Sequence, residues 1–187
     1  MRTGMFVLFF SIVLLVYFFV NYYIYSRGLQ LIPQGTDIRT WFKVVFWIVA
    51  SSYILGRVIE RFWISYFTDA LTWIGSFWLA AMLYLFLIVL FIDILRVGDY
   101  FFGYFPASMS SEKFKLYSLI TAVSLITVVV IIGHFNAINP KIKKLSIDID
   151  KQANGMKHLK IALASDIHMG TVIGPRRMTK FVKKMQE

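Results

Sequence analysis

The sequence predicts an α-helical transmembrane bundle of four spans, followed by the start of an α/β domain with the order strand, strand, helix. Composition is the first reason: of 187 residues, 58% are hydrophobic and 16% are charged, which is too apolar for an ordinary soluble domain. The other reasons are the lengths of the apolar runs and a change of periodicity after Pro140. We therefore expect residues 1–139 to form the transmembrane domain and residues 140–187 to begin a second domain.

Four apolar runs account for the expected spans. They cover about residues 5–25, 41–58, 70–95 and 115–135. The first and third can cross a hydrocarbon core of about 30 Å, and the first is too long for a signal peptide and lacks a small-residue cleavage site. The second is short, but the flanking Lys43 and Arg57 can extend their side chains toward water. We expect Ser110 or Ser111 to cap the fourth helix and Pro140 to end it.

Few polar side chains interrupt these runs. Asp93 and His134 are ionisable groups within expected spans, where such groups are costly and often functional. Both lie near helix ends where water can hydrate them, which disfavours a transport or proton-relay role. Small residues spaced four apart let helices approach closely. The pairs with this spacing are Ser76 with Ala80 and Ser118 with Ala122.

The net charge of +10 is concentrated after the last span. Residues 1–139 contain nine Lys/Arg and six Asp/Glu, whereas residues 140–187 contain eleven and four. This excess adjoins the bilayer, so it predicts contact with an anionic membrane surface or substrate; nucleic acid is disfavoured because no stacking or groove-reading motif accompanies the charge. A solvated face and a stop-transfer signal are the simpler alternative. The candidate residues are Lys141, Lys143, Lys144, Arg176 and Arg177.

Four crossings place both ends of the chain on the same side of the membrane. About seven basic residues lie near the spans on that side and about six on the other, so the positive-inside rule only slightly favours a cytoplasmic tail. We predict an integral multi-pass protein of a plasma or inner membrane, with its C-terminal tail in the cytoplasm. The absence of cysteine excludes disulfides and thiolate metal sites.

The periodicity of the tail differs from that of the spans. In KLSIDID, apolar and polar residues alternate, as in a half-buried strand. Asn154-Gly155 then indicates a turn, and LKIALAS, residues 159–165, predicts a second strand. From Pro175 onward, apolar residues at i, i+3, i+4 and i+7 predict an amphipathic helix. Two strands and one helix bury too little core to be stable alone, so we expect the N-terminal part of a longer protein or a truncated product.

Asp166 and His168 follow the second expected strand and are the candidate metal ligands. In an extended backbone, side chains two residues apart project to the same face, so a carboxylate and an imidazole can converge on one ion. This donor pair suits zinc, manganese or iron. Two ligands are fewer than the three or four that a metal site needs. The alternative is that Asp166 caps a turn and His168 is a polar loop residue.

LKIALASDIHMG resembles the first motif of the calcineurin-like metallophosphoesterases, an apolar strand followed by [ST]-D-x-H-x-G. The flanking segments, from about residue 141 to 187, are similar to the start of the membrane-anchored bacterial members. The resemblance implies that Asp166 and His168 bind the first ion of a centre with two divalent metals: manganese, iron or zinc. The family's later motifs, GDxxD, GNHE and GHxH, are absent. We therefore expect the 187 residues alone to be inactive.

The function that this resemblance implies is phosphoester hydrolysis by a membrane-anchored, metal-dependent enzyme. Its expected partners are the lipid bilayer and a phosphorylated, lipid-linked substrate. The rival hypothesis is a non-catalytic, multi-pass membrane scaffold, sensor or transporter component with a basic tail. Substitution of Asp166 and His168 discriminates the two, because only the enzyme depends on them.

Overall fold

The computed structural model describes residues 2–106, 109, 111–139, 141–147, 160–165, 167 and 174–186. The chain divides into two compact units, Met1–Ile131 and Ile132–Glu187. The first contains the packed helices, and the second contains the end of the fourth helix and the tail.

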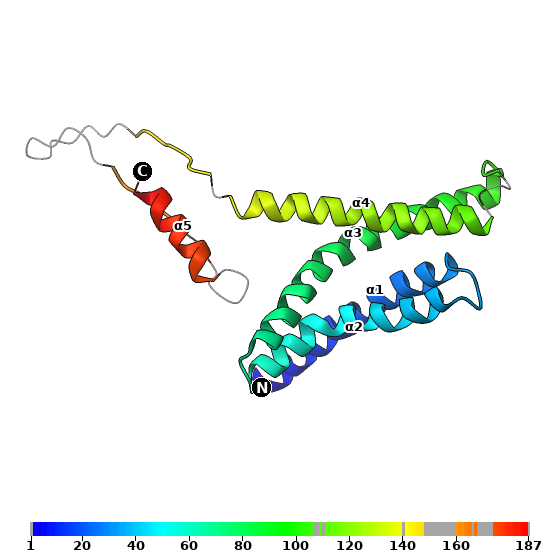
Figure 1. Cartoon of the computed structure of the whole chain (residues 1–187), viewed down its shortest axis with the longest axis horizontal. Helices are drawn as coiled ribbons and strands as arrows, with labels where there is room; N and C mark the ends of the chain where they lie inside the picture. Colours follow the sequence, from blue (N-terminus) through cyan, green and yellow to red (C-terminus); the bar gives the residue numbers. More distant parts are fainter. Residues whose placement is uncertain are drawn as a thin grey trace, which may run out of the picture. The chain divides into compact units, whose positions relative to one another are not determined.

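Four long helices form the first unit and the start of the second (Figure 1). They are α1 (Arg2–Gln30), α2 (Asp37–Glu60), α3 (Tyr66–Phe102) and α4 (Glu112–Ala137). Each is long and apolar enough to cross a membrane, which confirms, for the described residues, the prediction of four helices able to span a bilayer. The helices extend beyond the expected spans at both ends. The 37 residues of α3 correspond to about 55 Å, so this helix is longer than the hydrocarbon core.

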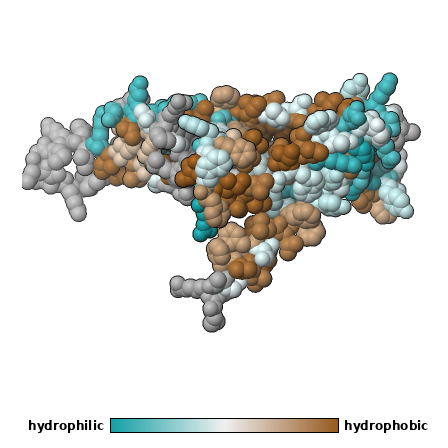
Figure 2. All heavy atoms as spheres, turned by 60° about the horizontal axis from the view of Figure 1, so that its bottom comes forward, coloured by the Kyte–Doolittle hydropathy of each residue, from teal (hydrophilic) through white to brown (hydrophobic). Residues whose placement is uncertain are grey.

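The surface of the helices is apolar. Hydrophobic side chains cover much of the visible face in Figure 2, and many large apolar side chains on all four helices are exposed. A soluble protein of this length would bury most of these side chains. Only a few hydrophobic residues are buried in the part of the chain that the structure describes. They are Ile24, Ile32, Phe46, Ala50 and Ile126.

The packed core lies where α1, α2 and α3 meet. α1 and α2 run antiparallel and are joined by a short turn (Figure 1). Ile24 of α1 packs with Phe46 and Ala50 of α2. Aromatic rings surround this cluster, and the Trp78 ring of α3 stands edge-on to Phe46 with centroids 5.1 Å apart. Large rings thus fill the space that the three helices enclose.

The crossing of α2 and α3 is closed by small residues. Modelling a Cβ atom on Gly56 would place it 2.8 Å from Thr72 Oγ1, and a Cβ on Gly75 would overlap the backbone of Tyr53. The small residues at this crossing, all buried, are Ser52, Gly56, Thr68, Thr72 and Gly75. The predicted Ser76/Ala80 pair does not close it, because Ala80 is exposed and the crossing lies one turn earlier in α3.

Local capping sets the helix ends. Ser65 and Thr68 form a reciprocal capping box at the start of α3. Gly103 ends that helix at φ 64°, a left-handed conformation that glycine adopts without strain. The Ser111 hydroxyl accepts a hydrogen bond from the Phe114 N–H at 3.3 Å. Ser111, one of the two predicted candidates, therefore caps α4.

The tail contains one helix among its described residues. Residues 141–147 and 160–165 form no strand there, so the expected β-β pairing is not seen in the described parts of the tail. A strand needs a hydrogen-bonded neighbour and an apolar face to pack against, and this short segment supplies little of either. The expected turn between the strands lies outside the described residues. The predicted amphipathic helix is confirmed as α5 (Pro175–Met185), with Gly174 before it and Pro175 at its first position.

Candidate functional sites

The two predicted metal ligands, Asp166 and His168, lie outside the described residues. Between them, Ile167 is half-buried and has no regular structure. Among the residues that the structure describes, no group of three or more His, Asp or Glu side chains could hold a metal ion. The prediction of a metal site therefore still depends on the chemistry of the D-x-H pattern.

The five basic candidate residues are placed in two different ways. Lys141, Lys143 and Lys144 are exposed in a segment without regular structure. Arg176 and Arg177 lie in the first turn of α5, and their side chains are outside the described part of the chain. Exposure of the lysines is compatible with contact to an anionic surface and equally with a solvated segment.

A buried amide joins α1 and α3 in the bundle interior, and a neighbouring tyrosine joins α1 to α2. The side chain of Asn21 in α1 is fully buried. Its Nδ2 donates to the Tyr17 carbonyl at 2.8 Å and contacts Met82 Sδ at 3.1 Å, while its Oδ1 accepts from Trp78 Nε1 at 2.9 Å. The Tyr17 hydroxyl donates to the Ala50 carbonyl of α2 at 2.5 Å. The amide is fully engaged in hydrogen bonds, so this network fixes the packing of α1, α2 and α3.

Asp93 forms an ion-pair cluster between α1 and α3. Its Oδ2 lies 2.8 Å from Arg27 Nε and accepts a hydrogen bond from the Tyr23 hydroxyl at 2.5 Å. Arg96 Nη1 is 3.6 Å from the other carboxylate oxygen. The Asp93 side chain is only 17% exposed, so its partners in the protein replace part of its hydration. The cluster ties two helices together.

His134 occupies the last turn of α4, close to the predicted end of that span. Its ring stands edge-on to Phe135, with centroids 6.0 Å apart. This geometry is a packing contact between neighbours in sequence.

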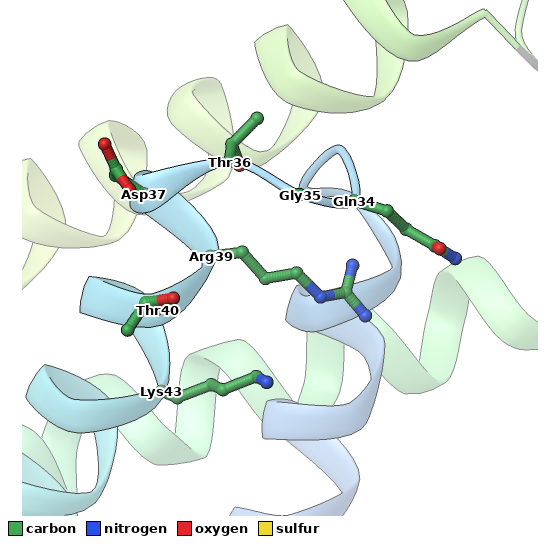
Figure 3. Close-up of a pocket in the computed structure, with 7 residues that line it drawn as sticks. All are labelled: Gln34, Gly35, Thr36, Asp37, Arg39, Thr40 and Lys43. Atoms are coloured by element: carbon green, nitrogen blue, oxygen red, sulfur yellow. The ribbon is translucent and has the colours of Figure 1, made fainter.

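A polar hollow of about 440 Å³ lies at the turn between α1 and α2, and we call it the α1–α2 hollow. Figure 3 shows Arg39 and Lys43 extending toward α1, with Asp37 directed away from them. Arg39 Nη1 donates to the Leu29 carbonyl at 3.1 Å and to the Ile32 carbonyl at 2.9 Å, so it satisfies acceptors left open at the end of α1. The residues that line the hollow are Gln34, Gly35, Thr36, Asp37, Arg39, Thr40 and Lys43.

Sequence reasoning did not find the Asn21 network or the α1–α2 hollow. Asn21 interrupts a run of aromatic and aliphatic residues, and an amide in that position signals an interhelical hydrogen bond. Thr36, Arg39, Thr40 and Lys43 have the spacing of one helix face. Both patterns were present in the sequence, but the residues that these side chains contact lie at other positions along the chain and could not be identified from the patterns alone.

The chain was also compared with known proteins. No protein-family model, curated protein or solved structure matches it.

Proposed function

We propose that this chain is the membrane anchor and the first metal-binding segment of a membrane-anchored, metal-dependent phosphohydrolase. The observation that carries the proposal is the sequence Ser165-Asp166-Ile167-His168-Met169-Gly170 after an apolar segment and before an amphipathic helix. An acid and a histidine two residues apart are suitable donors for manganese, iron or zinc. The four apolar helices would keep such a site close to a lipid surface.

The roles proposed for the residues follow from their chemistry. Asp166 would supply a carboxylate oxygen and His168 an imidazole nitrogen to one divalent cation. Two such cations in a complete centre would supply Lewis acidity toward the phosphoryl group and an activated water. Asp166 and His168 are two donors, so the proposal requires further ligands from sequence that follows Glu187, beginning with a GDxxD motif. The substrate class that we propose is a phosphoester linked to a lipid, with the tail in the cytoplasm.

The basic residues of the tail would act on the substrate electrostatically. Lys141, Lys143 and Lys144 are exposed next to the end of α4. Basic side chains at this position attract anionic headgroups by about 1 kcal/mol each near the surface. They would raise the local concentration of an anionic, lipid-linked substrate and would take no part in bond cleavage.

Metal binding by a protein that includes the residues encoded after Glu187 gives the first test. In phosphatidylcholine nanodiscs, Mn²⁺ binding is measured by electron paramagnetic resonance for this longer protein without substitution and with Asp166→Asn or His168→Ala. We expect each substitution to weaken binding about tenfold or more, because each removes one donor. Asp150→Asn changes the same charge in the same tail and should leave binding unchanged. If Asp166→Asn and Asp150→Asn weakened Mn²⁺ binding equally, the binding would be explained by nonspecific electrostatic attraction, which would contradict the proposed role of Asp166.

Activity of the longer reading frame gives the second test and separates the enzyme from a scaffold. A protein that includes the residues encoded after Glu187 should hydrolyse p-nitrophenyl phosphate with Mn²⁺, and Asp166→Asn should abolish this while membrane insertion is preserved. A stop codon after Glu187, or hydrolysis that is indifferent to Asp166→Asn, would contradict the proposal. Both results would favour the non-catalytic scaffold.

A further inference from the structure

The first two turns of α2 carry a continuous polar face. Lys43 follows Thr40 by three residues and Arg39 by four, so these three side chains lie on one side of the helix, and the N-cap residue Thr36 precedes them. All four line the α1–α2 hollow. The Thr40 hydroxyl and the two cations form a set of hydrogen-bond donors on one face, whereas the Thr36 hydroxyl already donates to the Pro33 carbonyl at 3.0 Å. The rest of α2 is a membrane span, so this polar face requires an explanation beyond the composition of the helix.

The two cations in the hollow differ in their existing partners. Arg39 uses Nη1 to hold the Leu29 and Ile32 carbonyls, which fixes the position of its guanidinium. The Lys43 ammonium makes no hydrogen bond or ion pair with the residues that the structure describes. Asp37 is the single acid of the lining and points away from both cations (Figure 3). The hollow therefore has an excess of positive charge and an available donor.

The hollow lies at the turn before the second span, which the four-span topology would place at the level of the lipid headgroups. One turn inside it, the Tyr25 and Phe42 rings are stacked with centroids 6.0 Å apart. Tyr22 and Tyr23 lie close by in sequence, and such aromatic clusters are typical of the membrane interface. Its volume of about 440 Å³ is within the usual range for small-ligand sites. The α1–α2 hollow is therefore open to a lipid headgroup and large enough to hold its phosphate.

We propose that the α1–α2 hollow binds a phosphate group, carried by an anionic lipid headgroup or free in solution. Lys43 supplies a charge-assisted hydrogen bond to a phosphate oxygen, Thr40 supplies a hydroxyl donor, and Arg39 supplies positive charge from a fixed position. In the four-span topology, the α1–α2 turn and the C-terminal tail are on opposite sides of the membrane. This site is therefore separate from the proposed phosphohydrolase centre and does not depend on it.

The binding test uses the whole chain in nanodiscs of phosphatidylcholine, with and without phosphatidic acid. Native mass spectrometry measures how much phosphatidic acid each variant retains. In a second arm, inorganic phosphate is titrated into phosphatidylcholine nanodiscs and into those with phosphatidic acid. Retention that survives added phosphate identifies the lipid as the source of the group. Binding of inorganic phosphate alone, with displacement of the lipid, identifies the free anion.

Four variants test the residues involved. Lys43→Gln should weaken retention about tenfold or more, because it removes a charge-assisted hydrogen bond. Lys113→Gln is the charge-matched control: it lies in the first turn of α4 on the same side of the membrane and should cost at most about fivefold, through surface charge alone. Thr40→Val removes a hydroxyl without changing charge and should cost about fivefold. Thr127→Val, on the exposed surface of α4, should have no effect.

Thr40→Val is the decisive substitution, since a nonspecific surface potential does not detect a neutral change. The proposal is overturned if Thr40→Val retains as much phosphatidic acid as Thr127→Val. It is also overturned if Lys43→Gln loses no more phosphatidic acid than Lys113→Gln. Circular dichroism and gel filtration verify that each variant remains folded. Arg39 is left unchanged because its loss would also release the end of α1.

Discussion

Two pairs of neighbouring apolar helices in this protein pack in opposite ways. α2 and α3 approach until the Gly75 backbone meets the Tyr53 backbone. Between α3 and α4, by contrast, a mainly apolar groove of about 390 Å³ stays open. Its lining residues are Ile88, Phe114, Tyr117, Ser118, Thr121, Ala122 and Leu125. Both pairs are rich in aliphatic and aromatic side chains, so hydrophobicity does not account for the difference.

The difference reflects the solvent in which these helices lie. Lipid tails are as apolar as leucine, so burial of apolar surface between spans provides little driving force, and close packing and polar contacts become decisive. Small residues provide close packing at the α2–α3 crossing. The polar contacts of Asn21, Tyr17 and Asp93 also connect α1 with α2 or α3. We infer that α1, α2 and α3 form the stable part of the helical bundle and that α4 is held more loosely.

Gly75→Ala should produce the largest loss of stability. The added Cβ overlaps the Tyr53 backbone, which cannot move as easily as a side chain, and we expect a loss of about 2–3 kcal/mol in the free energy of unfolding. Gly133→Ala is the matched control on α4, because a Cβ there has no atom within 4 Å. Unfolding in bicelles, followed by tryptophan fluorescence, measures both. Equal losses would show that α2–α3 packing is not tighter than that of α4.

The Asp93 cluster should contribute the next largest effect. A double-mutant cycle with Asp93→Asn and Arg27→Gln should give a coupling free energy of about 1–2 kcal/mol, because the carboxylate is mostly buried and also bonded to Tyr23. The Arg57–Glu60 pair, at 2.8 Å within α2, is the control. This pair is more exposed and should couple by only about 0.3–0.5 kcal/mol. Equal coupling free energies from the two cycles would show that the Asp93 cluster holds α1 and α3 together no more strongly than an exposed pair within one helix.

Trp78→Phe tests the hydrogen bond to the buried amide. It keeps most of the ring but removes the donor to Asn21 Oδ1, and we expect a loss of about 0.6–1.7 kcal/mol in unfolding free energy. Trp63→Phe, in the exposed turn between α2 and α3, should change stability by less than about 0.5 kcal/mol. If both variants were equally stable, the Asn21 network would not help to hold α1 and α3 together.

Ala122→Leu should have the smallest effect of this series. Ala122 lines the open groove between α3 and α4, so a larger side chain can enter free space, and we expect stability to change by less than about 0.5 kcal/mol. The same change at Ala50, which is 1% exposed in the core of α1, α2 and α3, should cost about 1–3 kcal/mol. A similar loss at both positions would mean that the groove is closed in the membrane.

The sequence was sufficient to predict the helical spans but not the contacts between them. Length and apolarity are local properties, so all four spans were found. The Gly56–Thr72 and Gly75–Tyr53 contacts depend on the register of two helices, which sequence spacing alone did not provide. The Ser76/Ala80 pair had the right spacing but lies one turn away from the crossing. Asp93 was recognised as unusual, yet its partner Arg27 is 66 positions away in the chain.

The tail shows a different limit of sequence reasoning. Its amphipathic helix was predicted correctly because α5 has a strong 3.6-residue period. Alternation in KLSIDID predicted a strand, but strand formation depends on a partner and not only on local pattern. The D-x-H pattern predicts donor chemistry, and its geometry lies in residues outside the described part of the chain.

The most direct test of the account is the topology of the four helices. Because the chain contains no cysteine, single cysteines introduced at Gln34, Phe62, Met109 and Lys141 can each be labelled specifically with a membrane-impermeant maleimide on intact and permeabilised cells. We predict that the cysteines at 34 and 109 react on intact cells, whereas those at 62 and 141 react only after permeabilisation. Labelling of positions 34 and 62 from the same side would show that α2 does not cross the membrane and would contradict the four-span anchor.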